Sequence, residues 1–195
     1  MEVPKRIDLD QRRAHLAEAV WTTIRERGIG AVSVRVVAAE AGVAVGSLRH
    51  VFPTRTELLL FSAELMLTRA TDRIRATPLT GDPQLDAVAL LTHILPLDPD
   101  SRAELEVNLA LIAEAPAVPE LVPVRDQTYQ QLVLLCEGVV RMLAPERDAE
   151  QRSHEARRLY ALADGLALHL LMEPAGADGA WALDLLREEV RRISA

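Results

Sequence analysis

Cysteine, aromatic residues and long apolar runs are all scarce in this chain of 195 residues. The single cysteine, Cys136, excludes an internal disulfide and any metal site built from several thiolates, and it suits a reducing compartment. No stretch approaches the roughly 20 consecutive apolar residues that a membrane-spanning helix needs. Lys5 and Arg6 are followed by no apolar run, so the N-terminus does not resemble a secretory signal. We therefore expect a cytoplasmic protein that makes no contact with a membrane.

Motifs that carry known enzyme chemistry are missing as well. The sequence contains no phosphate-binding loop, no glycine-rich dinucleotide turn, no nucleophile elbow and no histidine–carboxylate spacing typical of a metal site. We therefore expect no catalytic residues, no cofactor and no metal, and hence a protein that is not an enzyme. An enzyme of unfamiliar type and a helical scaffold without DNA binding remain the alternatives.

Charge is distributed unevenly along a chain whose formal net charge is −7. Residues 1–55 contain nine Lys or Arg and six Asp or Glu, whereas residues 56–195 contain 13 and 23. A basic N-terminal region on an acidic remainder is typical of a local contact with nucleic acid.

Apolar residues recur at helical intervals, and the alternation expected of strands is absent. The spacing of Thr54 and Glu57, and of Ser101 and Glu104, is that of a capping box, in which each side chain satisfies the backbone amide of the other residue. The sequence therefore predicts an all-α fold, and the change in charge divides it into residues 1–55 and residues 56–195. The predicted helices cover residues 11–27, 33–41, 44–51, 54–76, 82–96, 101–115, 119–143, 148–174 and 180–193, after a loose arm at residues 1–9.

Residues 33–59 read SVRVVAAEAGVAVGSLRHVFPTRTELL, and they predict two short helices joined by a tight turn. Ser33 is placed to cap the first of these helices, and Gly42 permits a positive φ at the turn. Apolar residues at Val37, Leu48 and nearby positions supply the wedge that fixes the angle between the helices. This is the arrangement of a helix-turn-helix, whose second helix lies in the major groove of DNA.

The stretch from Arg13 to Leu60 resembles the TetR family of one-component transcription regulators. The pattern that carries the resemblance is Arg27-Gly28, Ala41-Gly42-Val43, Gly46-Ser47-Leu48, Phe52 and Glu57-Leu58-Leu59. The resemblance implies double-stranded DNA as a partner, a third helix that reads the major groove, and a fourth helix whose start contacts phosphate through Arg55. The residues that it places at the DNA are Arg13, Ser33, Arg35, Val45, Gly46, Ser47, Arg49, His50, Thr54 and Arg55, with Lys5 and Arg6 reaching the DNA from the arm.

The chain departs from the usual family pattern at four positions of the predicted recognition helix. Ala44 and Val45 replace residues that are commonly polar. Arg49 stands where an aromatic residue is usual, and Val51 stands where a histidine is usual. An arginine at position 49 can bind guanine O6 and N7 or neutralise a phosphate. The operator sequence therefore stays open.

Residues 159–168, which read LYALADGLAL and are followed by Pro174, resemble the subgroup related to the choline/betaine repressor. The resemblance implies that the last two long helices pair with their copies across a twofold axis. We therefore expect a homodimer whose interface contains two apolar stripes, with burial within one chain as the alternative. The stripes are Leu159, Leu162, Leu166 and Leu170 in one helix and Leu183, Leu186 and Val190 in the other.

The middle helices of this family enclose a ligand pocket, so the resemblance also implies a small-molecule effector. It thus implies a DNA-binding domain over residues 1–55 and a ligand-binding and dimerisation domain over residues 56–195. With only two Phe and two Tyr in the chain, a ligand held mainly by stacked aromatic rings is not expected. The candidate ligand-binding residues, each of which can instead have an ordinary core or surface role, are Met66, His93, Asn108, Tyr129, Cys136 and Asp164. We expect a repressor that binds a palindromic operator as a dimer and is released by a ligand, with activation and the identity of the effector left open.

Overall fold

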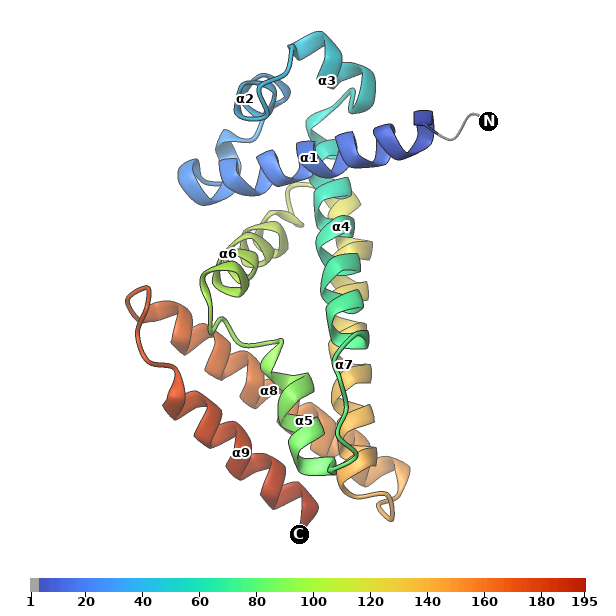
Figure 1. Cartoon of the computed structure of the whole chain (residues 1–195), viewed down its shortest axis with the longest axis vertical. Helices are drawn as coiled ribbons and strands as arrows, with labels where there is room; N and C mark the ends of the chain where they lie inside the picture. Colours follow the sequence, from blue (N-terminus) through green and yellow to red (C-terminus); the bar gives the residue numbers. More distant parts are fainter. Residues whose placement is uncertain (1–3) are drawn as a thin grey trace. The chain divides into compact units, whose positions relative to one another are not determined.

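The computed structural model describes the backbone of residues 4–195 and the side chains from Leu9 onward. Over this range the chain forms nine α-helices and two short 3₁₀ helices (Figure 1), which confirms the predicted all-α fold. The α-helices are α1 (Pro4–Arg27), α2 (Val34–Glu40), α3 (Val45–Val51), α4 (Arg55–Arg75), α5 (Pro83–Thr92), α6 (Pro99–Glu114), α7 (Val122–Leu143), α8 (Ala149–Met172) and α9 (Ala180–Ser194). The 3₁₀ helices are η1 (Ile29–Ala31) and η2 (Pro119–Leu121).

Local capping chemistry fixes several of these helix boundaries. The Asp82 carboxylate accepts hydrogen bonds from the amides of Gln84 and Leu85, and Pro83 occupies the first helical position of α5. Asp148 and Gln151 form a complete capping box at the start of α8. These two starts are where the sequence predicts them.

Two helix starts differ from the prediction. Helix α1 begins at Pro4 rather than at residue 11, so the predicted loose arm is wrong for residues 4–9. Helix α6 begins at Pro99 because Asp98, not Ser101, caps it: the Asp98 carboxylate accepts from the amides of Asp100 and Ser101, each at 2.9 Å. The Ser101 hydroxyl in turn accepts from the Asp98 amide, so serine is the reciprocal partner and aspartate is the cap.

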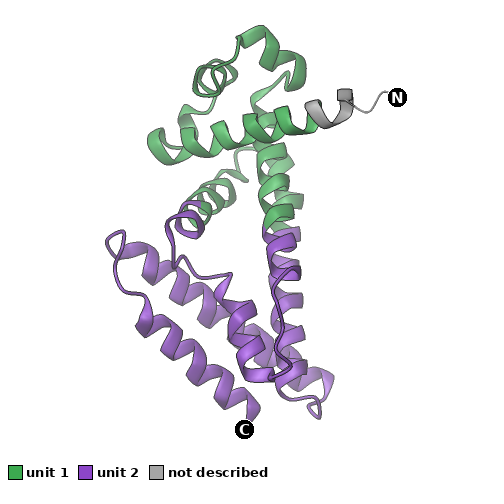
Figure 2. Ribbon diagram, viewed as in Figure 1, with its two compact units in different colours: residues 1–69, 104–126 green, residues 70–103, 127–195 purple. Residues whose placement is uncertain are grey.

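The chain divides into two compact units (Figure 2). Unit 1 contains residues 1–69 and 104–126, and unit 2 contains residues 70–103 and 127–195. This division does not coincide with the predicted domain boundary after residue 55, because the first part of α4 and the last part of α6 pack with the helix-turn-helix.

A continuous apolar core holds unit 1 together. It joins α1, α2, α3 and α4 through residues such as Leu16, Val37, Leu48 and Leu58, all of which are fully buried. The same core includes Val107 and Leu111 of α6 and Leu121 of η2. The helix-turn-helix is therefore packed against a segment that follows it in the sequence by more than 50 residues.

Unit 2 has a core of its own, formed where α9 contacts both α5 and α8. Leu91 of α5, Leu159 of α8 and Leu186 of α9 are each fully buried. None of the helices in the described part of the chain is both long and apolar enough to cross a membrane.

Candidate functional site

The helix-turn-helix of unit 1 is built by α2, the turn at Gly42, and α3. The Ser33 hydroxyl accepts a hydrogen bond from the Val36 amide and so caps α2, as predicted. Gly42 has a φ of 66°, a value that side chains disfavour, and it lets the Val43 amide donate to the Ala38 carbonyl at 2.9 Å. Together these contacts fix the position of α3 relative to α2.

Helix α3 presents one face to the core and the other to solvent. Leu48 is fully buried, and Phe52 at the end of the helix is buried as well. The predicted DNA-contacting residues Val45, Gly46, Arg49 and His50 are exposed, as is Arg35 of α2. The exposed side of α3 therefore carries two groups that can donate hydrogen bonds to bases or phosphates.

Helix α1 holds α3 and the turn in place through polar side chains. Arg12 donates a hydrogen bond to the Ser47 hydroxyl, and the His15 ring bonds the Ala41 carbonyl at 3.1 Å. The Arg13 guanidinium lies over the rings of Phe52 and Phe61, at 5.5 and 5.0 Å from their centroids. Arg12 was not among the predicted site residues, since its contact joins positions 35 residues apart and leaves no local pattern in the sequence.

Arg55 has a different position from the one that the resemblance implied. Its guanidinium donates to the carbonyls of Val32 and Ile29 at 2.9 and 3.1 Å and to the Glu114 carboxylate at 2.8 Å. These contacts tie α4 to the connection between α1 and α2 and to the end of α6. We therefore assign Arg55 to this internal tie and leave it out of the DNA-facing surface. Thr54, beside it, caps α4 by accepting from the Glu57 amide.

The candidate ligand-binding residues fall in both units. In unit 1, Met66 is buried in the core and Asn108 is half-buried on α6. In unit 2, the His93 ring is hydrogen-bonded to the Thr77 hydroxyl at 2.8 Å, and burial together with nearby Arg73 lowers the pKa of His93. These contacts give Met66 and His93 structural roles within their own units.

Tyr129, Cys136 and Asp164 lie on α7 and α8 of unit 2, and Tyr160 joins them. The rings of Tyr129 and Tyr160 meet edge to face, with centroids 5.5 Å apart. Burial raises the pKa of the Asp164 carboxyl, and it raises the pKa of the Cys136 thiol to about 12, with the Asp164 charge adding to that effect. Tyr160 was missed by sequence reasoning, although it stands four residues before Asp164, one helical turn away.

The two predicted dimer stripes are largely part of the core. Five of their seven residues, namely Leu159, Leu166, Leu170, Leu186 and Val190, are buried within the chain. The alternative of burial within one chain therefore holds for these five residues, which lie on two helices that contact each other. Leu162 and Leu183 are half-buried.

A second set of apolar side chains on the same two helices is exposed instead. Leu168 and Met172 of α8 are 41% and 81% exposed, and Trp181 and Leu185 of α9 are 36% and 43% exposed. Exposed apolar residues on two helices that contact each other are typical of an association surface.

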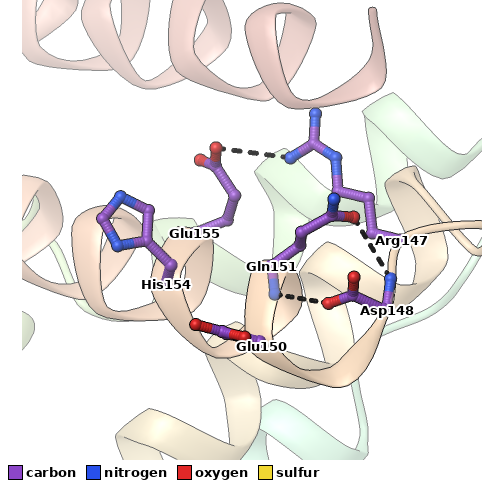
Figure 3. Close-up of a pocket in the computed structure, with 6 residues that line it drawn as sticks. All are labelled: Arg147, Asp148, Glu150, Gln151, His154 and Glu155. Carbon is purple, nitrogen blue, oxygen red and sulfur yellow. Dashed lines mark hydrogen bonds and ion pairs between the residues drawn. The ribbon is translucent and has the colours of Figure 1, made fainter.

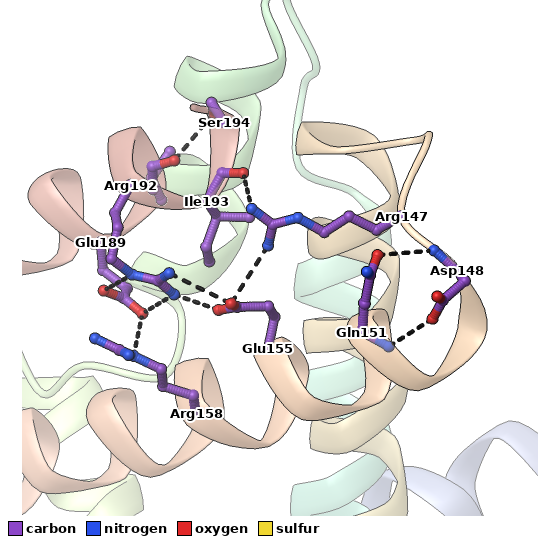
Figure 4. Close-up of polar contacts among 10 residues, drawn as sticks. Arg147, Asp148, Gln151, Glu155, Arg158, Glu189, Arg192, Ile193 and Ser194 are labelled. Atoms are coloured by element: carbon purple, nitrogen blue, oxygen red, sulfur yellow. Dashed lines mark hydrogen bonds and ion pairs between the residues drawn. The ribbon is translucent and has the colours of Figure 1, made fainter.

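A shallow hollow of about 560 Å³ lies at the start of α8 (Figure 3). Its lining includes Asp148 and Gln151, which cap the helix, and Arg147 and Glu155, whose side chains form an ion pair at 3.5 Å. No grouping of side chains able to hold a metal ion occurs in the part of the chain that the structure describes. The polar groups of this hollow serve the helix start and the contact with α9 (Figure 4).

Two family models match this chain, one in each half, and both describe transcription regulators. Residues 16–60 match the model of bacterial regulatory proteins of the tetR family, and residues 83–195 match the model of the C-terminal part of BetI-type transcriptional repressors. The HTH-type transcriptional regulator PksA of Bacillus subtilis (strain 168) is 35% identical over 176 residues, which cover 88% of this chain and 84% of PksA.

Solved structures extend the comparison to the whole fold. A transcriptional regulator from Rhodococcus sp. Rha1 is 27% identical, with a TM-score of 0.81 and coverage of 93% of this chain and 95% of that chain. The multidrug binding protein EbrR, complexed with malachite green, is 27% identical, with a TM-score of 0.66 and coverage of 91% and 97%. The similarity therefore spans both the helix-turn-helix and the C-terminal helices.

Proposed function

The chain belongs to the tetR family of bacterial transcriptional regulators, and we propose that it binds a palindromic operator as a homodimer and is released from it by a small molecule. It is a DNA-binding helix-turn-helix protein of repressor type, and its family is one of regulators rather than enzymes. The observation that carries the proposal is the exposed outer face of α3, held rigidly by α1 and α2.

In the proposed complex, α3 enters the major groove with Val45, Gly46, Arg49 and His50 towards the bases. Arg49 donates to guanine or to phosphate, and Arg35 of α2 contacts the backbone. Ser33 and Thr54 lie at helix starts, where backbone amides can face phosphate. Lys5 and Arg6 remain candidates for backbone or minor-groove contacts, but their side chains lie outside the described residues. Arg13 and Ser47 support α3 from the protein side.

The homodimer is proposed on the exposed apolar side chains of α8 and α9, Leu168, Met172, Trp181 and Leu185. A twofold symmetric pair of helix-turn-helix motifs matches the symmetry of a palindromic operator, because each copy reads one half-site. We propose this surface as the dimer interface in place of the two apolar stripes that the sequence favoured, because most residues of those stripes are buried within the chain.

The small-molecule effector is proposed because the similar multidrug binding protein EbrR is solved in complex with malachite green. Helices α4 and α6 each begin in one unit and end in the other, so a change in unit 2 can reach unit 1 through them. Release from DNA requires that the effector bind the DNA-free form more tightly, and a coupling of about 1–3 kcal/mol gives a change in affinity of about 5–150-fold. We expect the protein to act in the cytoplasm, as a bacterial DNA-binding regulator does.

In vitro selection of DNA fragments from the source genome tests this function. The purified full-length chain is mixed with the fragments at near-physiological salt, because nucleic-acid affinity without a stated salt concentration has no meaning. We expect enrichment of an inverted repeat bound by a dimer. A folded dimer that enriches no sequence would favour the alternative of a helical scaffold.

A further inference from the structure

The first turn of α6 holds the end of α8, and both segments belong to unit 2 (Figure 2). The Arg102 guanidinium donates hydrogen bonds to three carbonyls there, those of Leu170, Leu171 and Glu173, at 3.0, 2.6 and 2.9 Å. The last carbonyls of a helix have no partner within the helix, and the helix dipole also favours a cation at that end. Arg102 therefore caps α8 from another helix and ties its last turn to the start of α6.

A close backbone contact holds the other side of the turn between α8 and α9. Gly179 is the N-cap residue of α9, and a Cβ on it would lie 2.7 Å from Leu97 Cδ2 and 3.3 Å from Leu170 Cδ2. Its backbone angles, φ −82° and ψ 10°, do not require glycine, so it is the lack of space that favours glycine here. Leu97 lies just before α6, so the turn contacts the start of α6 on both of its sides.

The turn that these contacts hold carries the proposed dimer surface. Met172 is the last residue of α8 and Trp181 is the second residue of α9, so the exposed apolar residues begin on either side of the turn. Leu168 and Leu185 lie four residues further into the two helices and are exposed as well. Since a stable interface needs complementary shape, the relative position of the α8 pair and the α9 pair decides whether a second copy fits.

We propose that Arg102 is a positioning residue for dimerisation, which holds the α8 and α9 parts of the dimer surface in the relative position that a second copy requires. The inference rests on the homodimer of the proposed function and adds a residue that acts through others, because Arg102 is half-buried and bonds the backbone beneath the surface. Gly179 serves the same arrangement by letting Leu97 approach the turn.

Sedimentation equilibrium of the full-length chain over a range of concentrations measures the dissociation constant of the dimer. We expect Arg102→Met, which keeps an unbranched apolar stem and removes every donor, to weaken the dimer about tenfold, because the freed end of α8 must be ordered again on association. Arginine donates to the three carbonyls from two nitrogens, whereas lysine has only one. Arg102→Lys should therefore give a dimer of intermediate strength.

Two control variants separate positioning from a general loss of stability or charge. Val140→Ala removes buried methyl groups near the end of α7, which precedes the opposite end of α8 from the turn. We expect it to lower the Tm and to leave the dissociation constant of the dimer unchanged. Arg141→Met removes an exposed arginine of the same helix and should change neither quantity.

Gly179→Ala tests the turn while Arg102 is left in place. The added Cβ displaces the Leu97 side chain, and we expect a weaker dimer than that of the wild type. Leu97→Ala in the same chain removes the displaced atoms and should bring the dissociation constant back towards the wild-type value. Such restoration is a coupling between two contacting positions, which separate losses of stability do not produce.

The proposal is overturned if Arg102→Met dimerises as the wild type does, or if Val140→Ala at an equal loss of Tm weakens the dimer as much. A dimeric wild type with an unaffected Arg102→Met variant keeps the proposed homodimer and loses this inference. A wild-type chain that stays monomeric at every concentration overturns the proposed homodimer and this inference with it.

Discussion

Units 1 and 2 are built from similar helices, but their arginines join different parts of the fold. In unit 1, Arg55 donates to the carbonyls of Ile29 and Val32 and to the Glu114 carboxylate, and Arg13 covers the rings of Phe52 and Phe61. In unit 2, Arg192 bonds Glu155 and Glu189 (Figure 4), and Arg102 donates to the carbonyls of Leu170 and Leu171. The contacts in unit 1 hold the helix-turn-helix in position, and those in unit 2 join α8 to α6 and α9.

The exposed charges around α3 are a second feature that distinguishes unit 1. Arg35, Arg49 and His50 are exposed there, which suits an anionic partner such as DNA. The local distribution of charge around α3 therefore indicates the proposed DNA-facing surface more clearly than the net charge of −7 does.

The largest expected effect is on the free energy of unfolding, and it distinguishes a core position of unit 2 from a position on the proposed dimer surface. The two positions are neighbours in α9. Leu186 is fully buried and Leu185 is 43% exposed. We expect Leu186→Ala to lower the free energy of unfolding by about 2–5 kcal/mol, the usual cost of emptying a core leucine site. Leu185→Asp should leave the fold intact and shift the dimer towards monomer.

Chemical denaturation measures the first effect, and analytical ultracentrifugation over a range of concentrations measures the second. Because unfolding of a dimer depends on protein concentration, both variants are compared with the wild type at the same concentration. A Leu185→Asp chain that stays dimeric would remove this face from the proposed interface.

The next effect concerns the tie that Arg55 makes inside unit 1. We expect Arg55→Met to lower the free energy of unfolding by about 1–3 kcal/mol, because it leaves a partly buried Glu114 carboxylate and two carbonyls without their donor. A double-mutant cycle with Glu114→Gln isolates the ion pair. If Arg55 contacted phosphate instead, Arg55→Met would reduce the slope of DNA affinity against salt concentration, and we expect that slope to be unchanged.

Arg49 lies on the exposed face of α3, whereas Arg55 is bonded within unit 1, so the two arginines are expected to affect different properties. We expect Arg49→Ala to leave stability unchanged and to weaken operator binding by about 1–3 kcal/mol if the side chain reads a base. Fluorescence anisotropy with the selected operator, and with operators changed at one position in each half-site, measures both affinity and preference. Loss of preference at one position assigns Arg49 to a base, a uniform loss with a smaller salt slope assigns it to phosphate, and no loss removes it from the interface.

The sequence predicted unit 1 well because its helix-turn-helix depends on local signals. Ser33 caps α2, Gly42 takes the positive φ, and Leu48 is buried, each as the residue type and its neighbours require. The sequence did not predict the long-range contact in unit 1 between Arg55 and Glu114. These two residues are 59 positions apart, and no periodicity connects two such positions.

In unit 2 the helices and the caps of α5 and α8 were predicted, but the cap of α6 and the assignment of faces were not. The stripe containing Leu159, Leu166 and Leu170 was favoured as a dimer interface, yet the same spacing serves a buried intrachain face equally well. Which face of α8 is covered by α9 is decided by tertiary packing. The contact between Tyr129 and Tyr160 was not predicted, because these rings meet across two helices.

The smallest expected effect is the response of the charge network in unit 2 to acid. Hydrogen bonds from Arg192, with the charges of Arg147 and Arg158 nearby, hold the pKa of Glu155 below its ordinary value of 4.5. Because the pKa is lower in the folded chain, the stabilisation is complete above about pH 4.5 and is lost as the pH falls through the folded-state pKa. We expect Glu155→Gln to cost about 1 kcal/mol at neutral pH, because the network lies near the surface, and its difference from the wild type to shrink below pH 4.5. Denaturation at a series of pH values, with Glu188→Gln as the exposed control, measures this difference; a gap between Glu155→Gln and the wild type that stays constant in acid would assign the loss to packing rather than to the charge of Glu155.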